Sequence, residues 1–294
     1  MSALLKLNVF TLFLFLLITA CTQSQKNTPF KSPAGYDLTK PQRFRMHEDL
    51  LEISGIAFNN GQPDTVYGIE DEDGRVYYSR LGDNEVKYTH FAKQGDYEDI
   101  TLLNNRIYAL KSNGTIFSFS LNEVNRDKPD NVTESKHILP KAEYEGMYAD
   151  NQSGKIYVLC KNCGGKNKQE LIGGYILQTV ADSLKQTGSF TINAKTPLTG
   201  TDKKSDTFRP SGLAKNPVDK QWYIISASNN MLVITDEKWN VKDTYKLKGA
   251  RFLQPEGIAF DKDGNMYISN EGDELSNANI LKFVYNKASV NNGR

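Results

Sequence analysis

One short phrase recurs along this chain, and its spacing constrains the fold more than any other feature. Each copy begins with Ser or Glu, usually continues with Gly, and then alternates apolar residues with small or polar ones. The copies begin at Ser54, Glu98, Glu145, Ser211 and Glu256, so that successive steps are 44, 47, 66 and 45 residues. A second apolar segment containing tyrosine follows each copy. A period in the forties with several short strands per unit is typical of β-propeller blades.

The residues between the copies predict four strands in each complete unit. The strands of three units are expected at 54–58, 65–71, 74–81 and 85–91, at 98–103, 106–110, 114–121 and 135–139, and at 211–215, 221–227, 230–237 and 243–249. The last unit lacks a fourth strand, because the chain becomes polar soon after 278–286. We expect residues 36–46 to supply that outer strand and close the ring, which removes an exposed sheet edge.

The expected fold class is therefore all-β: a propeller of five blades, each of four antiparallel strands, closed by an N-terminal strand. Six blades are the alternative, because the 66-residue step after Glu145 leaves room for an extra hairpin or a long loop.

Residues 1–20 have the pattern of a targeting segment. Lys6 is the only charge, and the apolar run that follows is too short to span a bilayer as a helix. It ends in "LITAC", which resembles the lipobox of bacterial lipoproteins, so Cys21 is predicted to be the lipidated first residue, carrying palmitate-type acyl chains. The alternative is ordinary signal cleavage beside an incidental cysteine. Residues 21–34 are expected to be a flexible tether, 35–288 a single propeller domain and 289–294 a polar tail.

Charge limits the partners of this chain. The sequence has 36 Lys and Arg against 35 Asp and Glu, and loss of Lys6 with the signal peptide makes the numbers equal. A balanced, interspersed charge argues against a nucleic-acid partner and leaves the lipid as the attachment to the membrane. We expect a monomer in the cell envelope, lipid-anchored to the outer membrane and facing the periplasm, since no acidic run follows Cys21. Its partner would be a small ligand or an envelope protein.

The residues that open the blades are the candidate site. The first strand of every blade lines the central channel, so Glu98, Glu145 and Glu256 are expected to converge at one end, with Ser54 and Ser211 between them. Converging carboxylates raise a pKa, recruit Lys or Arg, or bind a cation. Hard oxygen ligands suit calcium, so these three glutamates are a tentative Ca²⁺ site. The structural alternative is that each accepts backbone N–H bonds from a neighbouring blade.

Other candidate residues lie outside that ring. Arg209, in "FRPSG", is expected at the channel mouth, where it either neutralises the glutamates or pairs with an anionic ligand; we favour neutralisation. Cys160 and Cys163 form "CKNC" without a second pair of zinc ligands, so a local disulfide is expected in an oxidising compartment. The alternative is a redox-active dithiol.

The order of the blade-opening pairs, Ser54-Gly55, Glu98-Asp99, Glu145-Gly146, Ser211-Gly212 and Glu256-Gly257, resembles that of the SdiA-regulated family of β-propeller proteins. The resemblance covers residues 36–286 and is closest in "PEGIAFDKDGNMYISNE". The chain departs from the simplest family pattern at 161–173 and 194–207. The resemblance implies a propeller in the cell envelope with links to calcium or signalling. More distantly, the fold resembles calcium-dependent propeller enzymes such as phytases and lactonases.

No nucleophile elbow, zinc-protease motif or P-loop is present in the sequence. We therefore expect a non-catalytic protein that binds a ligand or partner at one face of the propeller, with a possible Ca²⁺ cofactor. The alternative is a metal-dependent hydrolase of an ester, lactone or phosphate that uses the channel carboxylates.

Overall fold

The computed structural model describes residues 31–163, 171–181, 183–193, 208–247 and 249–291. The expected signal peptide, the lipidation residue Cys21 and the tether up to residue 30 lie outside the described residues. Within the described ranges, no helix has the length and apolar character needed to cross a membrane.

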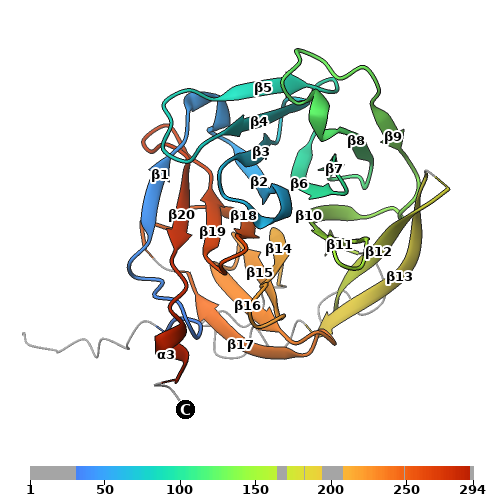
Figure 1. Cartoon of the computed structure of the whole chain (residues 1–294). Helices are drawn as coiled ribbons and strands as arrows, with labels where there is room; N and C mark the ends of the chain where they lie inside the picture. The colour runs from blue at the N-terminus through green and yellow to red at the C-terminus, as the bar shows by residue number, and fades with distance from the viewer. Residues whose placement is uncertain (1–30, 164–170, 182, 194–207, 248, 292–294) are drawn as a thin grey trace, which may run out of the picture. The chain divides into compact units, whose positions relative to one another are not determined.

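Five four-stranded antiparallel sheets are arranged as blades around a central channel (Figure 1). Blade 1 contains β2 (Ile53–Phe58), β3 (Val66–Glu70), β4 (Arg75–Ser79) and β5 (Lys87–His90). Blade 2 contains β6 (Tyr97–Leu103), β7 (Arg106–Lys111), β8 (Ile116–Ser120) and β9 (Thr133–Ser135). Blade 3 contains β10 (Glu143–Asp150), β11 (Lys155–Asn162), β12 (Leu171–Val180) and β13 (Ser183–Asn193). Blade 4 contains β14 (Gly212–Lys215), β15 (Trp222–Ser226), β16 (Met231–Thr235) and β17 (Val241–Lys246).

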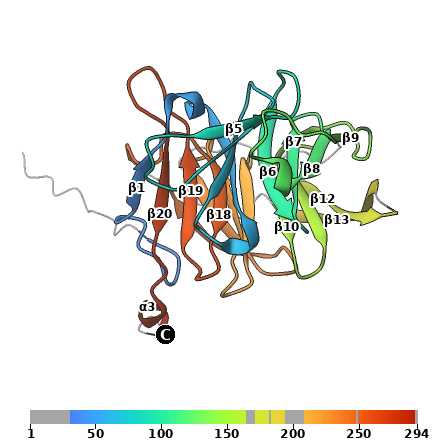
Figure 2. The same ribbon diagram turned by 45° about the horizontal axis from the view of Figure 1, so that its top comes forward.

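Blade 5 joins the two ends of the described chain. It contains β18 (Pro255–Phe260), β19 (Met266–Asn270) and β20 (Asn279–Phe283), and β1 (Gln42–Arg45) is its outer strand. Figure 2 shows β1 beside β20, and Gln42 pairs with Lys282 and Arg45 with Asn279. The predictions of five blades and of an N-terminal closing strand are thus confirmed, and the six-blade alternative is wrong. In the part of the chain that the structure describes, helix is limited to the 3-10 turns η1 (Glu48–Leu50), η2 (Asn59–Gly61) and η3 (Leu121–Glu123) and to α3 (Lys287–Asn291).

The long step after Glu145 is explained by blade 3. Its outer hairpin is formed by β12 and β13, of 10 and 11 residues, which project from the ring in Figure 2. The polar stretch 194–207 noted in the sequence lies outside the described residues.

The outer strand of blade 2 was predicted at 135–139 and is found at Thr133–Ser135 instead. His137 has φ +57°, which interrupts an extended strand, and Leu139 is buried in the apolar cluster between blades 2 and 3. The apolar side chains of Ile138 and Leu139 therefore pack between blades 2 and 3, and these residues do not form the outer strand.

The core is divided among the interfaces between neighbouring blades. One apolar cluster lies between blades 5 and 1, a second between blades 1 and 2, a third between blades 2 and 3, and a fourth between blades 3 and 4. Between blades 4 and 5, Tyr36 contacts Tyr223 and Phe260 edge-on or tilted, and its hydroxyl donates to the carbonyl of Gly264 at 2.6 Å. The segment before β1 thus fixes the ring where the two ends of the domain meet.

Hydrogen bonds between strands of neighbouring blades also join the blades. The Ser269 hydroxyl donates to the carbonyl oxygen of Ser54 at 2.8 Å, linking blade 5 to blade 1, and both residues are buried. We expect Ser269→Ala to lower the free energy of unfolding by about 1 kcal/mol, since a buried acceptor loses its donor. Urea unfolding would measure this, with the exposed Ser289→Ala as the control. An unchanged midpoint would contradict the role given to this bond.

Candidate functional site

The three blade-opening glutamates share one local geometry. In the inner strands β6, β10 and β18, the residues on either side of the glutamate pair with the second strand of the blade, but the glutamate itself does not. In β6, for example, Tyr97 pairs with Lys111 and Asp99 with Leu110, so Glu98 is skipped. The same irregularity surrounds Glu145 and Glu256. Each glutamate is therefore the extra residue of a β-bulge, a device that turns a side chain out of the sheet pattern.

The glycine after the opening residue is required by a close approach of two backbones. A Cβ at Gly257 would lie 2.5 Å from the carbonyl oxygen of Ser54, and a Cβ at Gly212 would lie 2.6 Å from that of Glu256. Neighbouring inner strands meet here, so a side chain has no room. This explains why Gly follows Ser or Glu in four of the five copies.

Asp99 replaces that glycine in blade 2 and fastens the ring. Its buried carboxylate accepts the backbone N–H of Ile100 at 2.8 Å and that of Met147, in blade 3, at 2.6 Å. Such bonds were the structural alternative for Glu98, Glu145 and Glu256, yet among the described residues none of these glutamates accepts a backbone N–H at its carboxylate. The fastening carboxylate is the neighbouring aspartate.

The two blade-opening serines have structural contacts. The Ser211 hydroxyl donates to the carbonyl of Pro255 at 2.9 Å and accepts the N–H of Ala227 at 3.2 Å. The Ser54 carbonyl accepts the Ser269 bond described above. Burial raises the pKa of Glu256 and the nearby Ser211 opposes this, so Ser211 lies at the edge of the glutamate cluster.

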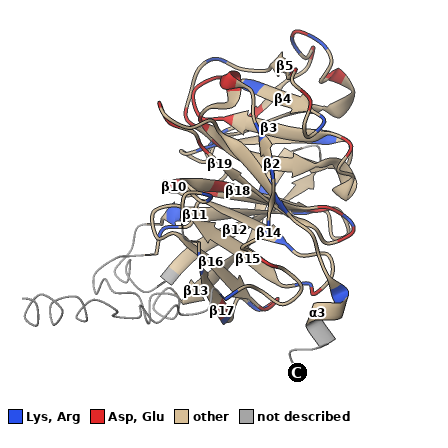
Figure 3. Cartoon of the chain, turned by 90° about the vertical axis from the view of Figure 1, so that its left-hand side faces the viewer, with Lys and Arg blue, Asp and Glu red and all other residues tan. Residues whose placement is uncertain are grey.

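The three glutamates do converge, and they surround an ammonium group. Lys161 Nζ lies 2.6 Å from Glu145 Oε1, and the Glu145 side chain is 7% exposed. Burial raises the pKa of Glu98, and Glu145 lies close enough for its charge to raise that pKa further, while Lys161 interacts electrostatically with both Glu98 and Glu256. Figure 3 shows the acidic segments beside β10 and β18 and the basic segment beside β11 on one side of the ring. We call Glu98, Glu145 and Glu256, together with Lys161, the acidic cluster.

Burial and mutual repulsion keep protons on this cluster. Burial, and then the charges of Glu145 and Asp96, raise the pKa of Glu98 to about 9. Burial, and then the charges of Glu271 and Glu145, raise the pKa of Glu256 to about 8. Burial also raises the pKa of Glu145, although Lys161 opposes this. At neutral pH the cluster therefore holds protons that isolated glutamates would have lost.

Further carboxylates from blades 5 and 1 extend the acidic region. Burial and the charge of Asp71 raise the pKa of Glu271 to about 7, while burial and the charge of Glu52 raise that of Asp71 to about 6. Asp71 Oδ1 is buried without a hydrogen-bond partner among the described residues. Asp71 and Glu271 directly follow the second strands of their blades, β3 and β19, outside the blade-opening repeat.

The expected contact of Arg209 with the glutamates is not found among the described residues. Arg209 is exposed, forms no ion pair within the described ranges, and contacts the fold through its backbone N–H, which donates to Asn229 Oδ1 at 2.9 Å. The cation that neutralises the glutamates is Lys161, which ends the second strand of blade 3.

The tentative calcium set does not form a metal-binding group. Within the described part of the chain, no three His, Cys, Asp or Glu side chains are arranged to hold one metal ion. Lys161 Nζ lies beside Glu145 at the place where a cation would be held, so the arrangement fits an ammonium better than Ca²⁺.

A disulfide joins Cys160 to Cys163 and encloses Lys161 in its loop. We expect the Cys160→Ser/Cys163→Ser variant to lose at most about 2 kcal/mol of unfolding free energy, because so short a loop restricts the unfolded chain little. Guanidinium unfolding would measure this, with the oxidised and the reduced parent protein as references. A much larger loss would show that the loop stabilises the fold by other contacts.

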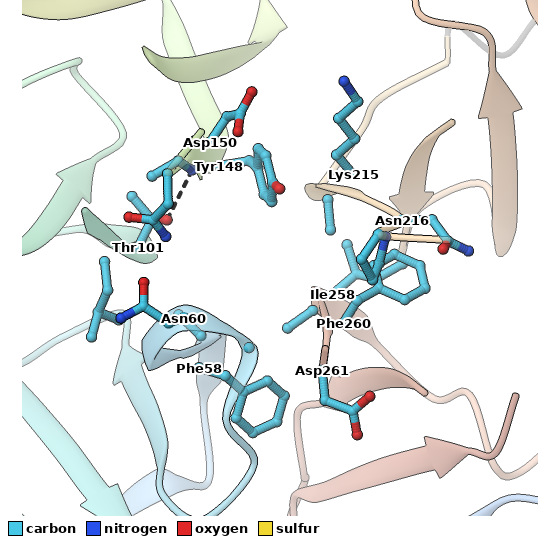
Figure 4. A pocket seen from close by; sticks show the side chains of 18 of the residues that line it. Phe58, Asn60, Thr101, Tyr148, Asp150, Lys215, Asn216, Ile258, Phe260 and Asp261 are labelled. Atoms are coloured by element: carbon cyan, nitrogen blue, oxygen red, sulfur yellow. Dashed lines mark hydrogen bonds between the residues drawn. The ribbon is translucent and has the colours of Figure 1, made fainter. Parts of the chain in front are cut away.

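A cavity lies at the opposite end of the inner strands. Its volume is about 370 Å³, and its lining begins two residues after each blade-opening position and continues past the strand ends (Figure 4). None of the blade-opening residues lines it. Sequence reasoning missed this cavity, because its lining is apolar and small residues that also read as ordinary inner-strand core.

Comparisons with known proteins agree with this fold. A luciferin-regenerating enzyme is 11% identical with a TM-score of 0.53, covering 83% of this chain and 95% of that one. A streptogramin B lyase is 13% identical, with a TM-score of 0.49 and coverage of 84% and 98%. A calcium-binding regucalcin from Agrobacterium tumefaciens is 12% identical, with a TM-score of 0.49 and coverage of 86% and 95%. At 11% identity, the likeness to the luciferin-regenerating enzyme shows the propeller fold alone.

No curated protein matches the sequence. The family model described as SdiA-regulated matches residues 169–274, from blade 3 to blade 5, which confirms over that part of the chain its similarity to the SdiA-regulated family.

Proposed function

We propose that this chain is a non-catalytic binding protein of the bacterial cell envelope, and that its acidic cluster binds a ligand bearing a protonated amine or guanidinium. The observation that carries this is the contact between Lys161 and Glu145 at 2.6 Å within three bulged glutamates. The chain's own ammonium marks the position that a ligand's ammonium would take. Charge-assisted hydrogen bonds of this kind are stronger than neutral ones.

The surrounding charge favours a further cation. Glu98, Glu256 and Glu271 have pKa values raised to about 9, 8 and 7, so each can release a proton when a positive group approaches. Asp71 Oδ1 adds a buried acceptor that has no donor among the described residues. A cationic ligand would therefore exchange with protons as well as with Lys161.

The hydrolase alternative needs a metal ion with an open position. The contact of Lys161 with Glu145 and the absence of a ligand set among the described residues give that function no support from geometry. We therefore propose binding and not hydrolysis.

Attachment to the membrane through Cys21 is part of the proposal and rests on the sequence "LITAC". Labelled palmitate should enter the protein in bacterial cells, and Cys21→Ser should abolish the label and release the protein from membranes. Label retained by Cys21→Ser would contradict the anchor.

Melting curves with different cations test the binding proposal. Spermidine should raise the melting temperature at low salt, whereas Ca²⁺ and Mg²⁺ at matched ionic strength should have little effect. Glu145→Gln/Glu256→Gln should lose the spermidine shift, and the exposed Glu274→Gln is the matched control. A shift with Ca²⁺ that is absent with spermidine would overturn the proposal and restore the calcium interpretation.

A further inference from the structure

We propose that the cavity at the end opposite the acidic cluster is a second binding site, for a small amphipathic anion. Its volume of about 370 Å³ falls in the range of small-molecule sites, which begins at roughly 300 Å³. This site is separate from the proposed function above, because no residue of the acidic cluster lines the cavity.

The inner part of the cavity is apolar and is built by every blade. Each inner strand contributes one buried aliphatic side chain, two residues after its opening position: Ile56, Ile100, Met147, Leu213 and Ile258. Beyond them, small residues leave room along the walls, namely Ala57, Ala149, Ala214 and Ala259. A chamber with such a lining favours the apolar body of a ligand.

Tyr148 supplies a hydrogen-bond donor inside this apolar chamber. It occupies the position at which three other blades have alanine, and its ring reaches into the cavity in Figure 4. Its ring packs edge-on against Trp222, with the centroids 5.4 Å apart, and its hydroxyl has no hydrogen-bond partner among the described residues. Burial raises the pKa of Tyr148, so the hydroxyl keeps its proton and can donate to a ligand's acceptor.

The carboxylates of the two acidic residues in the cavity lining already accept hydrogen bonds from nearby residues of their own blades. Asp150 accepts the N–H of Gln152 at 3.0 Å and the hydroxyl of Ser153 at 2.8 Å. Asp261 is buried and accepts bonds from the backbone of Asp263, from Asn265 and from the Tyr267 hydroxyl. Neither carboxylate needs a cationic ligand.

The ammonium groups of the lysines at the cavity rim have fewer polar partners than these carboxylates. Lys215 pairs with Glu237 at 3.2 Å, but Lys220 donates only to the carbonyl of Pro217, and Lys262 forms no ion pair within the described ranges. At this mouth the carboxylates of Asp150 and Asp261 already accept several hydrogen bonds, whereas the ammonium groups of Lys220 and Lys262 have N–H donors left for an anionic group. An apolar body with an anionic group matches the chamber, the Tyr148 donor and this rim together.

Anilinonaphthalene sulfonate is a suitable probe, because it combines aromatic rings with an anionic acceptor. The chain contains two tryptophans, and Trp239 stacks on Trp222 with centroids 4.4 Å apart. Trp222 in turn contacts Tyr148 at the cavity wall. We expect saturable binding of one probe per natively folded chain, with quenching of tryptophan fluorescence by energy transfer to the probe.

Three variants separate this site from surface binding. Ile258→Trp, which fills the chamber, should weaken probe binding more than 10-fold. Tyr148→Phe, which removes only the hydroxyl, should weaken it about 2- to 10-fold, and Lys262→Gln by about 2-fold. The exposed Lys287→Gln should bind like the parent protein. Near-ultraviolet circular dichroism would verify that each variant is folded.

Two results would overturn the proposal. One is the absence of saturable binding by the folded parent protein. The other is equal binding by the parent protein and by folded Tyr148→Phe and Lys262→Gln.

Discussion

Raising the pH from 5 to 8 is expected to lower the free energy of unfolding by about 2 to 4 kcal/mol. Glu98 and Glu256 have pKa values of about 9 and 8 in the folded chain, well above their ordinary value. In this interval the folded chain keeps protons that the unfolded chain has lost, so stability falls as pH rises and levels off only above the folded pKa values. Each group contributes at most about 1.4 kcal/mol per pH unit, and partial exposure and coupling reduce this.

Glu98→Gln/Glu256→Gln should flatten this dependence, because glutamine carries no proton to lose. The variant should be more stable than the parent protein at pH 8 and nearly equal to it at pH 5. Chemical unfolding at several pH values measures both effects. A parent protein whose stability rises from pH 5 to pH 8 would contradict the account of the cluster.

Lys161→Met is expected to lower the free energy of unfolding by about 2 to 3 kcal/mol at pH 8. Removing one partner of a buried ion pair leaves an uncompensated charge on Glu145. The cost is below that of a fully buried pair, because the Lys161 side chain is 37% exposed and solvent screens it. At pH 5 the cost should become small, since Glu145 can then take up a proton.

The double variant Glu145→Gln/Lys161→Met provides the control for this prediction. It lacks the charge that Lys161 compensates, so it should lose much less stability at pH 8 than Lys161→Met. Equal losses in the two variants would show that Lys161 stabilises the fold through the packing of its side chain and not through its charge.

The repeat in the sequence was sufficient to predict the fold. The blade-opening positions gave the inner strands, and the missing fourth strand after 278–286 correctly indicated that β1 closes the ring. The outer strand of blade 2 was displaced because Ile138 and Leu139 have the apolar character of a strand but pack between blades. Outer strands bury little, so their sequences specify them weakly.

The site was less predictable, for a geometric reason. Equivalent positions on inner strands must converge, so the meeting of Glu98, Glu145 and Glu256 followed from the repeat. The partner Lys161 lies on a second strand, and the pairing of β10 with β11 skips both Lys161 and Glu145, whose side chains meet at 2.6 Å. A β-bulge has no clear signature in a single sequence. The sequence therefore indicated Arg209, which stands just before the blade-opening Ser211, as the cation that neutralises the glutamates.

The cavity could not be predicted, because whether alanine and isoleucine line a packed core or an open chamber depends on the spacing of the five strands. Tyr148 is the one signal: it stands where Ala57, Ala214 and Ala259 occupy the equivalent place in other blades. The repeat makes this departure visible, but only the structure shows the space beside it.

Calorimetric titration with spermidine tests the central claim most directly. The titration is run at low salt and neutral pH in two buffers of different ionisation enthalpy, which counts the protons exchanged. The account predicts that the parent protein binds spermidine with net release of protons, and that Lys161→Met binds it about 10-fold more tightly, because the competing ammonium is gone. Binding that is absent in the parent protein, or that is no tighter in Lys161→Met, would contradict the claim that Lys161 marks a site for a ligand's cationic group.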